Sequence, residues 1–181
     1  MFGLFGCDTK KFDQTAMPVS GDTIATITTN MGVIKIKFFA DLAPEIVKNF
    51  TTLAGEGYYD GLIFHRIIEG FMIQGGDPKG NGTGGHSYKG EDTKLDDEIA
   101  PELSHIRGAV SMANSGPNTN GSQFFIVHKD STFLDGGYSI FAQVYEGMDV
   151  VDAIASVEVD ENDKPLTDVV IEKVEVGEVT E

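Results

Sequence analysis

Tryptophan is absent from this sequence of 181 residues, cysteine occurs once, and arginine occurs only twice, as Arg66 and Arg107. The single cysteine, Cys7, excludes an intramolecular disulfide. No apolar run approaches the roughly 20 residues that a membrane-spanning helix needs. Basic residues are also few, because 13 lysines and arginines stand against 29 acidic residues, for a formal net charge of −16. A surface of this sign repels nucleic acid and anionic membranes, so we expect neither as a partner.

The acidic residues gather in residues 91–102 and 158–181. Such runs are typical of a solvated, solubilising surface, with an acidic metal site or a basic partner as the alternative. No G-x-S-x-G motif of a serine hydrolase occurs. We expect no metal and no cofactor, because the spacing typical of metal ligands is also missing from the four histidines, His65, His86, His105 and His128.

Residues 1–20 have no clear periodicity and are predicted to form an N-terminal extension, followed by a single domain over residues 21–181. The segment Leu4-Phe5-Gly6-Cys7 superficially resembles a lipoprotein cleavage site. However, the six residues before Cys7 include no basic residue, whereas a secretory signal begins with positive charge. A disordered or loosely docked extension is therefore the favoured interpretation, and lipidation of Cys7 is the alternative.

Short β-branched runs separated by turn residues dominate the rest of the chain, and they predict an all-β fold. Apolar residues at helical spacing after Pro44 predict a helix that ends near Gly55, and a second short helix is predicted around residues 148–155. A closed barrel or a sandwich with helical caps fits this pattern. The predicted strands are residues 23–29, 33–38, 63–68, 71–74, 108–113, 122–128, 138–144 and 169–176.

Two segments have an unusual composition. Residues 64–77, FHRIIEGFMIQGGD, place one arginine and one glutamine among large apolar residues, and residues 112–125, MANSGPNTNGSQFF, place amides beside a phenylalanine pair. Burying a guanidinium without partners is costly, so Arg66 is either paired or at the edge of a cleft. Residues 80–85 match G-x-G-x-x-G, but no helical pattern follows them, which argues against a dinucleotide site.

These two segments resemble the signatures of cyclophilins, the cyclosporin-binding class of peptidyl-prolyl cis–trans isomerases. The sequences GNGTGG and FLDGGYSIFAQV also match the family pattern, and the similarity covers about residues 21–176. The resemblance implies a closed eight-stranded antiparallel barrel capped by two α-helices. It also implies isomerisation of X–Pro bonds in proline-containing peptides and in unfolded or folding proteins, as a folding helper or chaperone. We expect a monomer.

The resemblance implies catalytic roles for Arg66, Phe71 and Gln74. Arg66 would donate a hydrogen bond to the proline nitrogen, while Gln74 and Gln123 would orient Arg66 and the substrate carbonyl. An apolar pocket would receive the proline ring, and Asn114 would hold the peptide as an extended segment. The implied substrate-binding residues are Met72, Gly82, Ala113, Asn114, Gln123, Phe125, Phe133, Leu134 and Tyr138.

Two positions depart from the familiar eukaryotic pattern. Phe133 stands where those members carry a tryptophan, and Tyr138 stands where they carry a histidine. The missing indole N–H removes a hydrogen-bond donor, so we expect weakened binding of cyclosporin A. Both substitutions are common among bacterial relatives, which predicts a bacterial-like, cytoplasmic enzyme.

Two other function classes stay open as alternatives. A proline-peptide binding or chaperone module without turnover is disfavoured, because binding alone needs fewer residues than Arg66, Phe71, Gln74 and Phe125 together. A barrel that holds a small ligand is disfavoured because side chains fill the interior of an eight-stranded barrel.

Overall fold

A computed structural model describes residues 12–180 of the chain. Cys7 and its suggested lipidation therefore lie outside the described residues. All eight predicted strands and both predicted helices are present, with ends shifted by up to a few residues, and a short 3₁₀ turn, η1 (Thr132–Leu134), was not predicted. The elements are β1 (Thr23–Thr29), β2 (Gly32–Phe38), α1 (Pro44–Gly55), β3 (Arg66–Ile68), β4 (Met72–Gly75), β5 (Ala109–Met112), β6 (Phe124–Val127), β7 (Ile140–Glu146), α2 (Met148–Ala155) and β8 (Ile171–Glu178).

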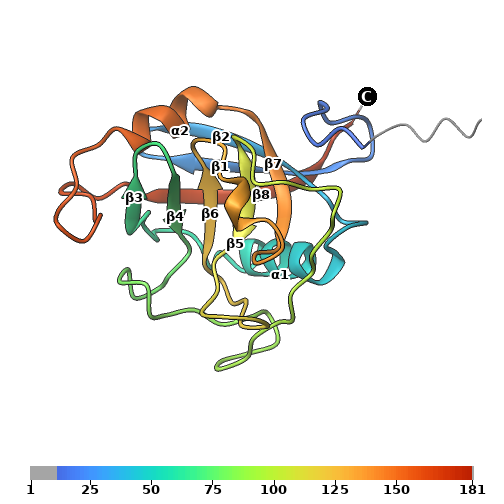
Figure 1. The fold of residues 1–181 in the computed structure, drawn as a ribbon, viewed down its shortest axis with the longest axis horizontal. Coiled ribbons are helices and arrows are strands. Elements are labelled where there is room, and N and C mark those ends of the chain that lie inside the picture. Colours follow the sequence, from blue (N-terminus) through green and yellow to red (C-terminus); the bar gives the residue numbers. More distant parts are fainter. Residues whose placement is uncertain (1–11, 181) are drawn as a thin grey trace, which may run out of the picture.

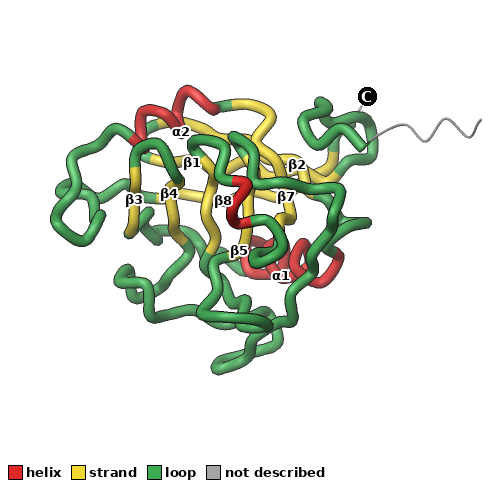
Figure 2. The backbone as a smooth tube through the Cα atoms, viewed as in Figure 1, coloured by secondary structure: helices red, strands yellow, loops and turns green. Residues whose placement is uncertain are grey.

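The strands form one antiparallel sheet in the order β3-β4-β6-β5-β7-β2-β1-β8 (Figures 1 and 2). The prediction of a closed barrel is wrong, because within residues 12–180 the two edge strands, β3 and β8, do not pair. The Ile67 N–H on β3 donates instead to Asp163 O at 2.8 Å, in the loop after α2. Residues just before the edge strands meet across the gap, where Phe64 N–H donates to Val169 O at 2.9 Å. The sheet is therefore an open half-barrel.

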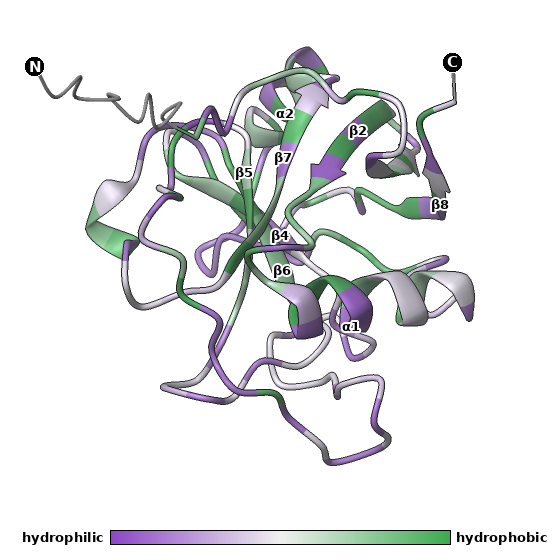
Figure 3. Ribbon diagram, turned by 90° about the vertical axis from the view of Figure 1, so that its right-hand side faces the viewer, coloured by the Kyte–Doolittle hydropathy of each residue, from purple (hydrophilic) through white to green (hydrophobic). Residues whose placement is uncertain are grey.

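The interior of the half-barrel is filled by apolar side chains, among which Phe50, Phe124 and Phe141 are fully buried. A second apolar cluster lies on the outer face of β4, β6, β5 and β7. Neighbouring residues of a strand point to opposite faces, so Phe124 packs inside and Phe125 outside. Figure 3 shows hydrophobic stretches along β5 and β6, polar residues within β2 and β7, and many polar residues in the connecting loops. Apolar side chains thus pack the interior of the half-barrel, while Met72 and Phe125 belong to the cluster on the outer face.

Helix α1 begins at Pro44, where a missing N–H costs nothing, and it buries Ile46, Phe50 and Leu53 against the interior. Its N-terminus has no cap from its own segment. The carboxylate of Glu98 accepts hydrogen bonds from Glu45 N at 3.2 Å and from Ile46 N at 2.8 Å. Glu98, one of the acidic residues of the segment 91–102, thus caps helix α1. The partial positive charge at the N-terminus of the helix stabilises its carboxylate.

Residues 12–20, the described part of the predicted extension, pack on the domain. The rings of Phe12 and Phe39 meet edge to face with centroids 5.6 Å apart. Gln14 is 7% exposed and bonds both backbone groups of Ser104 at 2.9 Å. Phe12 and Gln14 therefore contact the domain, while most of residues 12–20 are exposed. Among the described helices, none has the length and apolar character needed to cross a membrane.

Candidate active site

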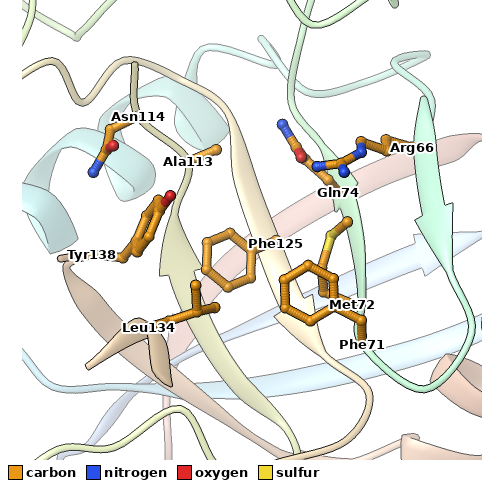
Figure 4. Close-up of a pocket in the computed structure, with 9 residues that line it drawn as sticks. All are labelled: Arg66, Phe71, Met72, Gln74, Ala113, Asn114, Phe125, Leu134 and Tyr138. Carbon is orange, nitrogen blue, oxygen red and sulfur yellow. The ribbon is translucent and has the colours of Figure 1, made fainter. Parts of the chain in front are cut away.

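A cavity of about 170 Å³ opens on the outer face of the sheet (Figure 4). Strands β3, β4 and β6, the segment after β5 and the turn η1 contribute its walls. Its nine lining residues all belong to the twelve that the sequence singled out: Arg66, Phe71, Met72, Gln74, Ala113, Asn114, Phe125, Leu134 and Tyr138.

Strand pairing explains why residues distant in sequence meet here. Arg66 on β3 lies opposite Gln74 on β4, and Gln74 lies opposite Phe125 on β6. Side chains of paired residues share a face of the sheet, so these three form a row across the outer surface. The pattern places a charge, an amide and an aromatic ring side by side, with the ring deepest and only 4% of Phe125 exposed.

The other three predicted residues lie outside this cavity. Gly82 and Gln123 line a neighbouring cavity of about 140 Å³, which shares Gln74, Ala113 and Asn114 with the first. Phe133 is 76% exposed, and its ring stacks on Phe71 with centroids 5.7 Å apart. The η1 turn directs Leu134 toward the cavity and leaves Phe133 on the rim, because successive residues of a tight turn point in different directions.

Gln74 lies beside Arg66 in the cavity, and its side-chain hydrogen bond goes to Gln123 (Figure 4). The Gln74 side-chain amide donates to Gln123 Oε1 at 2.9 Å, and Gln123 in turn donates to Gly82 O at 3.0 Å. Arg66 is instead paired through its Nε with Asp163 Oδ2 at 3.5 Å. The sequence left open whether Arg66 is paired or lies at the edge of a cleft. In the structure Arg66 does both.

Asp77 organises the glycine-rich loop beside the cavity. Its buried carboxylate accepts hydrogen bonds from the backbone N–H groups of Lys79, Asn81 and Gly82 at 2.6–3.0 Å. Burial opposes the ionisation of Asp77, but these backbone donors outweigh it and lower its pKa. Gly82 has a φ of +86°, which favours glycine at this point of the turn. The backbone N–H groups of this loop are thus directed at the Asp77 carboxylate.

A family model described as cyclophilin type peptidyl-prolyl cis-trans isomerase/CLD matches residues 24–176 of the chain. The chain belongs to the cyclophilin family. The match spans β2 to β7 completely and most of β1 and β8, and it contains all the residues that line the cavity.

Individual cyclophilins are similar over most of this chain. Peptidyl-prolyl cis-trans isomerase-like 1 of Neurospora crassa is 50% identical over 85% of this chain and 94% of that protein. Peptidyl-prolyl cis-trans isomerase cyp15 of Rhizopus delemar is 53% identical over 85% of this chain, which spans only 24% of the Rhizopus protein. A further relative, from Schizosaccharomyces pombe, is likewise spanned to only 23% of its length.

Solved cyclophilin structures have the same fold. A crystal structure of a Cryptosporidium parvum cyclophilin type peptidyl-prolyl cis-trans isomerase is 40% identical, with a TM-score of 0.84 over 88% of this chain and 99% of that one. A second crystal structure of that protein, in the presence of the dipeptide Ala-Pro, has a TM-score of 0.82 over 86% of this chain and 99% of that one.

The expected bacterial subgroup is not supported. Relatives from Schizosaccharomyces pombe and Arabidopsis thaliana are 57% and 49% identical, against 46% for a relative from Streptococcus pyogenes. Phe133 and Tyr138 are two substitutions at the rim of one groove, which is too little to place a chain within the family.

A buried layer that the sequence did not reveal supports the cyclophilin cavity. The His105 ring stacks on Phe125 with centroids 5.9 Å apart. Its Nδ1 lies 2.7 Å from Asp135 Oδ1, and its Nε2 lies 3.0 Å from Ser111 Oγ. Both ring nitrogens are thus occupied, which fixes the plane against which Phe125 rests. No group of three or more potential metal ligands was found within residues 12–180.

The stability of the domain should depend on pH through two histidines. Burial lowers the pKa of His65 and His105 below the ordinary value of 6.5, and for His105 it outweighs the opposing effect of Asp135. Below pH 6.5 these two histidines therefore bind more protons in the unfolded chain than in the folded chain. Protonation thus favours the unfolded state, and the free energy of unfolding should fall as the pH drops below 6.5. Asp77 and Asp135, whose pKa values are lowered from 3.8, add a separate loss only in stronger acid.

Thermal unfolding measured from about pH 7.5 to about pH 5 tests this expectation. The unfolding midpoint should decrease across that range, and the decrease should be smaller in His65→Gln, which retains a polar side chain without the titrating imidazole. A midpoint that stays constant or rises toward pH 5 would contradict it.

Proposed function

We propose that this chain accelerates cis–trans isomerisation of X–Pro amide bonds in peptides and folding proteins. One observation carries the proposal: the Arg66 guanidinium stands at the edge of an apolar cavity whose floor is Met72 and Phe125. Phe71 and Leu134 complete walls of a size suited to a proline ring. Arg66 is the one charged residue among those that line this cavity.

The reaction needs only a modest lowering of its barrier. Resonance in the amide sets a rotational barrier of about 18–20 kcal/mol. Uncatalysed exchange takes tens to hundreds of seconds, so a turnover of roughly 1–10³ per second needs an acceleration of about 10²–10⁵. That acceleration corresponds to about 3–7 kcal/mol. Hydrogen bonding and an apolar environment can supply this amount without a nucleophile.

Arg66 acts on the twisted amide rather than on the planar one. Rotation about the C–N bond breaks the resonance, so the proline nitrogen becomes pyramidal and regains its lone pair. The Arg66 guanidinium can then donate a hydrogen bond to that nitrogen, which it cannot do well in the planar ground state. Arg66 therefore binds the twisted transition state more strongly than the planar ground state. Such preferential binding lowers the barrier and raises the rate.

The rest of the groove holds the peptide in place. The Asn114 side-chain amide donates to Gly137 O at 3.0 Å, which fixes the segment after β5 beside the cavity. The Gln74–Gln123 pair and the glycine-rich loop continue the groove into the neighbouring cavity. A peptide in extended conformation can therefore place its proline beside Phe125 and its flanking residues along this surface.

A protease-coupled assay on an Ala-Pro tetrapeptide tests the proposal. The wild-type chain should shorten the slow cis-to-trans phase in proportion to enzyme concentration. A chain that binds the tetrapeptide without changing this phase would instead be a proline-peptide binding module, and the proposed activity would be wrong. We propose folding proteins in the cytoplasm as the natural substrates, supported by the highly charged, solubilising surface.

Cyclosporin A should bind this chain weakly, and Phe133→Trp should strengthen it. Phe133 is 76% exposed on the rim and stacks on Phe71, so an indole can replace the phenyl ring without disturbing the core. The new N–H would supply the hydrogen-bond donor that phenylalanine lacks, and one such bond corresponds to roughly a ten-fold gain in affinity.

Isothermal titration of both proteins with cyclosporin A measures this gain. Phe133→Tyr is the matched control, because it enlarges the ring without an indole N–H. Nanomolar affinity of the wild-type chain would contradict the expectation.

A further inference from the structure

Asp163 reaches Arg66 from a loop that contributes nothing to the proline cavity. Its Oδ2 lies 3.5 Å from Arg66 Nε, with the two side chains 41% and 46% exposed. Within residues 12–180, no other ion pair or hydrogen bond holds this guanidinium. Contact through Nε leaves both terminal nitrogens of Arg66 free for a substrate.

The backbone fixes Asp163 next to β3. Its carbonyl accepts the Ile67 N–H at 2.8 Å, and its own N–H donates to Asp160 O at 3.1 Å. Asp160 braces the same loop, because its Oδ1 accepts from Asn162 N at 2.8 Å and from Lys164 N at 3.0 Å. The loop, orange-red at the left of Figure 1, lies directly beside β3. A turn held by several hydrogen bonds therefore places the Asp163 carboxylate beside Arg66.

The conformation of Asp163 restricts which residues can stand there. Its φ is +64°, a left-handed conformation that glycine, asparagine and aspartate tolerate and other residues avoid. Glycine or asparagine would satisfy the turn equally well, and neither carries a charge. Of the residues suited to this backbone, aspartate alone is ionised at neutral pH and can pair with Arg66.

We infer that Asp163 is a positioning residue that holds the Arg66 guanidinium toward the proline nitrogen. The inference rests on the proposed isomerase function. A long side chain has many rotamers, and an anchor at Nε restricts them to those in which the terminal nitrogens face the cavity. Because the positioning matters most when the twisted amide forms, its loss should lower kcat and leave KM nearly unchanged.

Asp163→Gly and Asp163→Asn test this directly, since both keep the left-handed turn. Asp163→Gly should lower kcat about three- to five-fold, the order expected for a half-exposed ion pair, and Asp163→Asn should lower it less. Asp92→Gly is the matched control, because Asp92 has a φ of +60°, is exposed, and lies outside the cavity. Its substitution removes the same charge and should leave kcat unchanged.

Nuclear magnetic resonance supplies a readout that does not depend on activity. The chain has two arginines, so the arginine Nε–H region holds two signals. Asp163→Gly should shift the Arg66 signal and leave that of Arg107, which is paired with Asp152, in place. In an Arg66→Lys background, which has no Nε, Asp163→Gly should have no further effect on the rate.

Several outcomes would overturn the inference. They are an unchanged or increased kcat in Asp163→Gly, a loss of rate with an unmoved Arg66 signal, or an equal loss in Asp92→Gly. A wild-type chain without isomerase activity would instead overturn the proposed function, while the Arg66 signal would still report whether Asp163 holds the guanidinium.

Discussion

Arg66→Ala should lower kcat/KM for an Ala-Pro tetrapeptide by about 10²- to 10³-fold, the usual cost of removing one donor from a transition state. The cavity walls would stay intact, because Arg66 contributes only its edge. Proline would still bind, but the pyramidal nitrogen would lose the one charged donor that the cavity offers. The loss should therefore appear in kcat more than in KM.

The fold should survive this substitution. The Arg66 side chain is 46% exposed, and its ion pair with Asp163 is of the kind that contributes at most about 1 kcal/mol. Arg107→Ala is the matched control, since it removes the only other arginine, which binds Asp152 at 2.8 Å away from the cavity. Arg107→Ala should isomerise the peptide at the wild-type rate. Wild-type activity in Arg66→Ala would show that catalysis does not depend on the guanidinium.

Most of the cavity residues were predicted through the resemblance of residues 64–77 and 112–125 to cyclophilin signatures, and strand alternation accounts for part of their arrangement. Alternation along β4 puts Met72 and Gln74 on one face, and the same reasoning separates Phe124 from Phe125 on β6. The helix face of α1 followed from its spacing alone. Local periodicity determines which side chains of one strand share a face, whereas the choice of groove residues came from the resemblance.

Contacts between distant segments were not predictable in the same way. Asp163 reaches Arg66 across 97 positions, and nothing in its local sequence distinguishes it from other acidic loop residues. The stacking of His105 on Phe125 likewise results from tertiary packing, and the local sequence around His105 does not indicate it. Phe133 was assigned to the groove through the resemblance, but the tight turn directs Leu134 into the cavity and leaves Phe133 on the rim.

The open edge of the sheet shows how a loop can override a strand pattern. A closed barrel would require the two edge strands, β3 and β8, to pair with each other. β3 has only three residues, and Ile67 N–H bonds Asp163 O rather than β8. The bond that leaves the sheet open is therefore also one that fixes Asp163 beside Arg66. The partner of an edge strand depends on which segment the tertiary fold places beside it. The periodicity of the sequence does not specify that segment.

Phe50→Ala should lower the free energy of unfolding by about 3–5 kcal/mol, the range for removing a buried phenylalanine. Phe50 is fully buried at the centre of an aromatic cluster. Its ring centroid lies 4.8–5.7 Å from those of Phe38, Tyr59, Phe124 and Phe141. A cavity at this point removes contacts from α1 and the sheet together, so the surrounding side chains cannot easily close it.

Calorimetry should show this as a decrease of roughly 6–20 °C in the unfolding midpoint, given the size of the domain. Phe133→Ala is the matched control, because the same atoms are removed from a ring that is 76% exposed, and its midpoint should hardly change. At low temperature the folded fraction of Phe50→Ala should still isomerise the tetrapeptide, since Phe50 lies on the opposite side of the sheet from the cavity. A midpoint within about 2 °C of the wild type would mean that the core repacks around the missing ring, and that α1 does not depend on the aromatic cluster for its attachment.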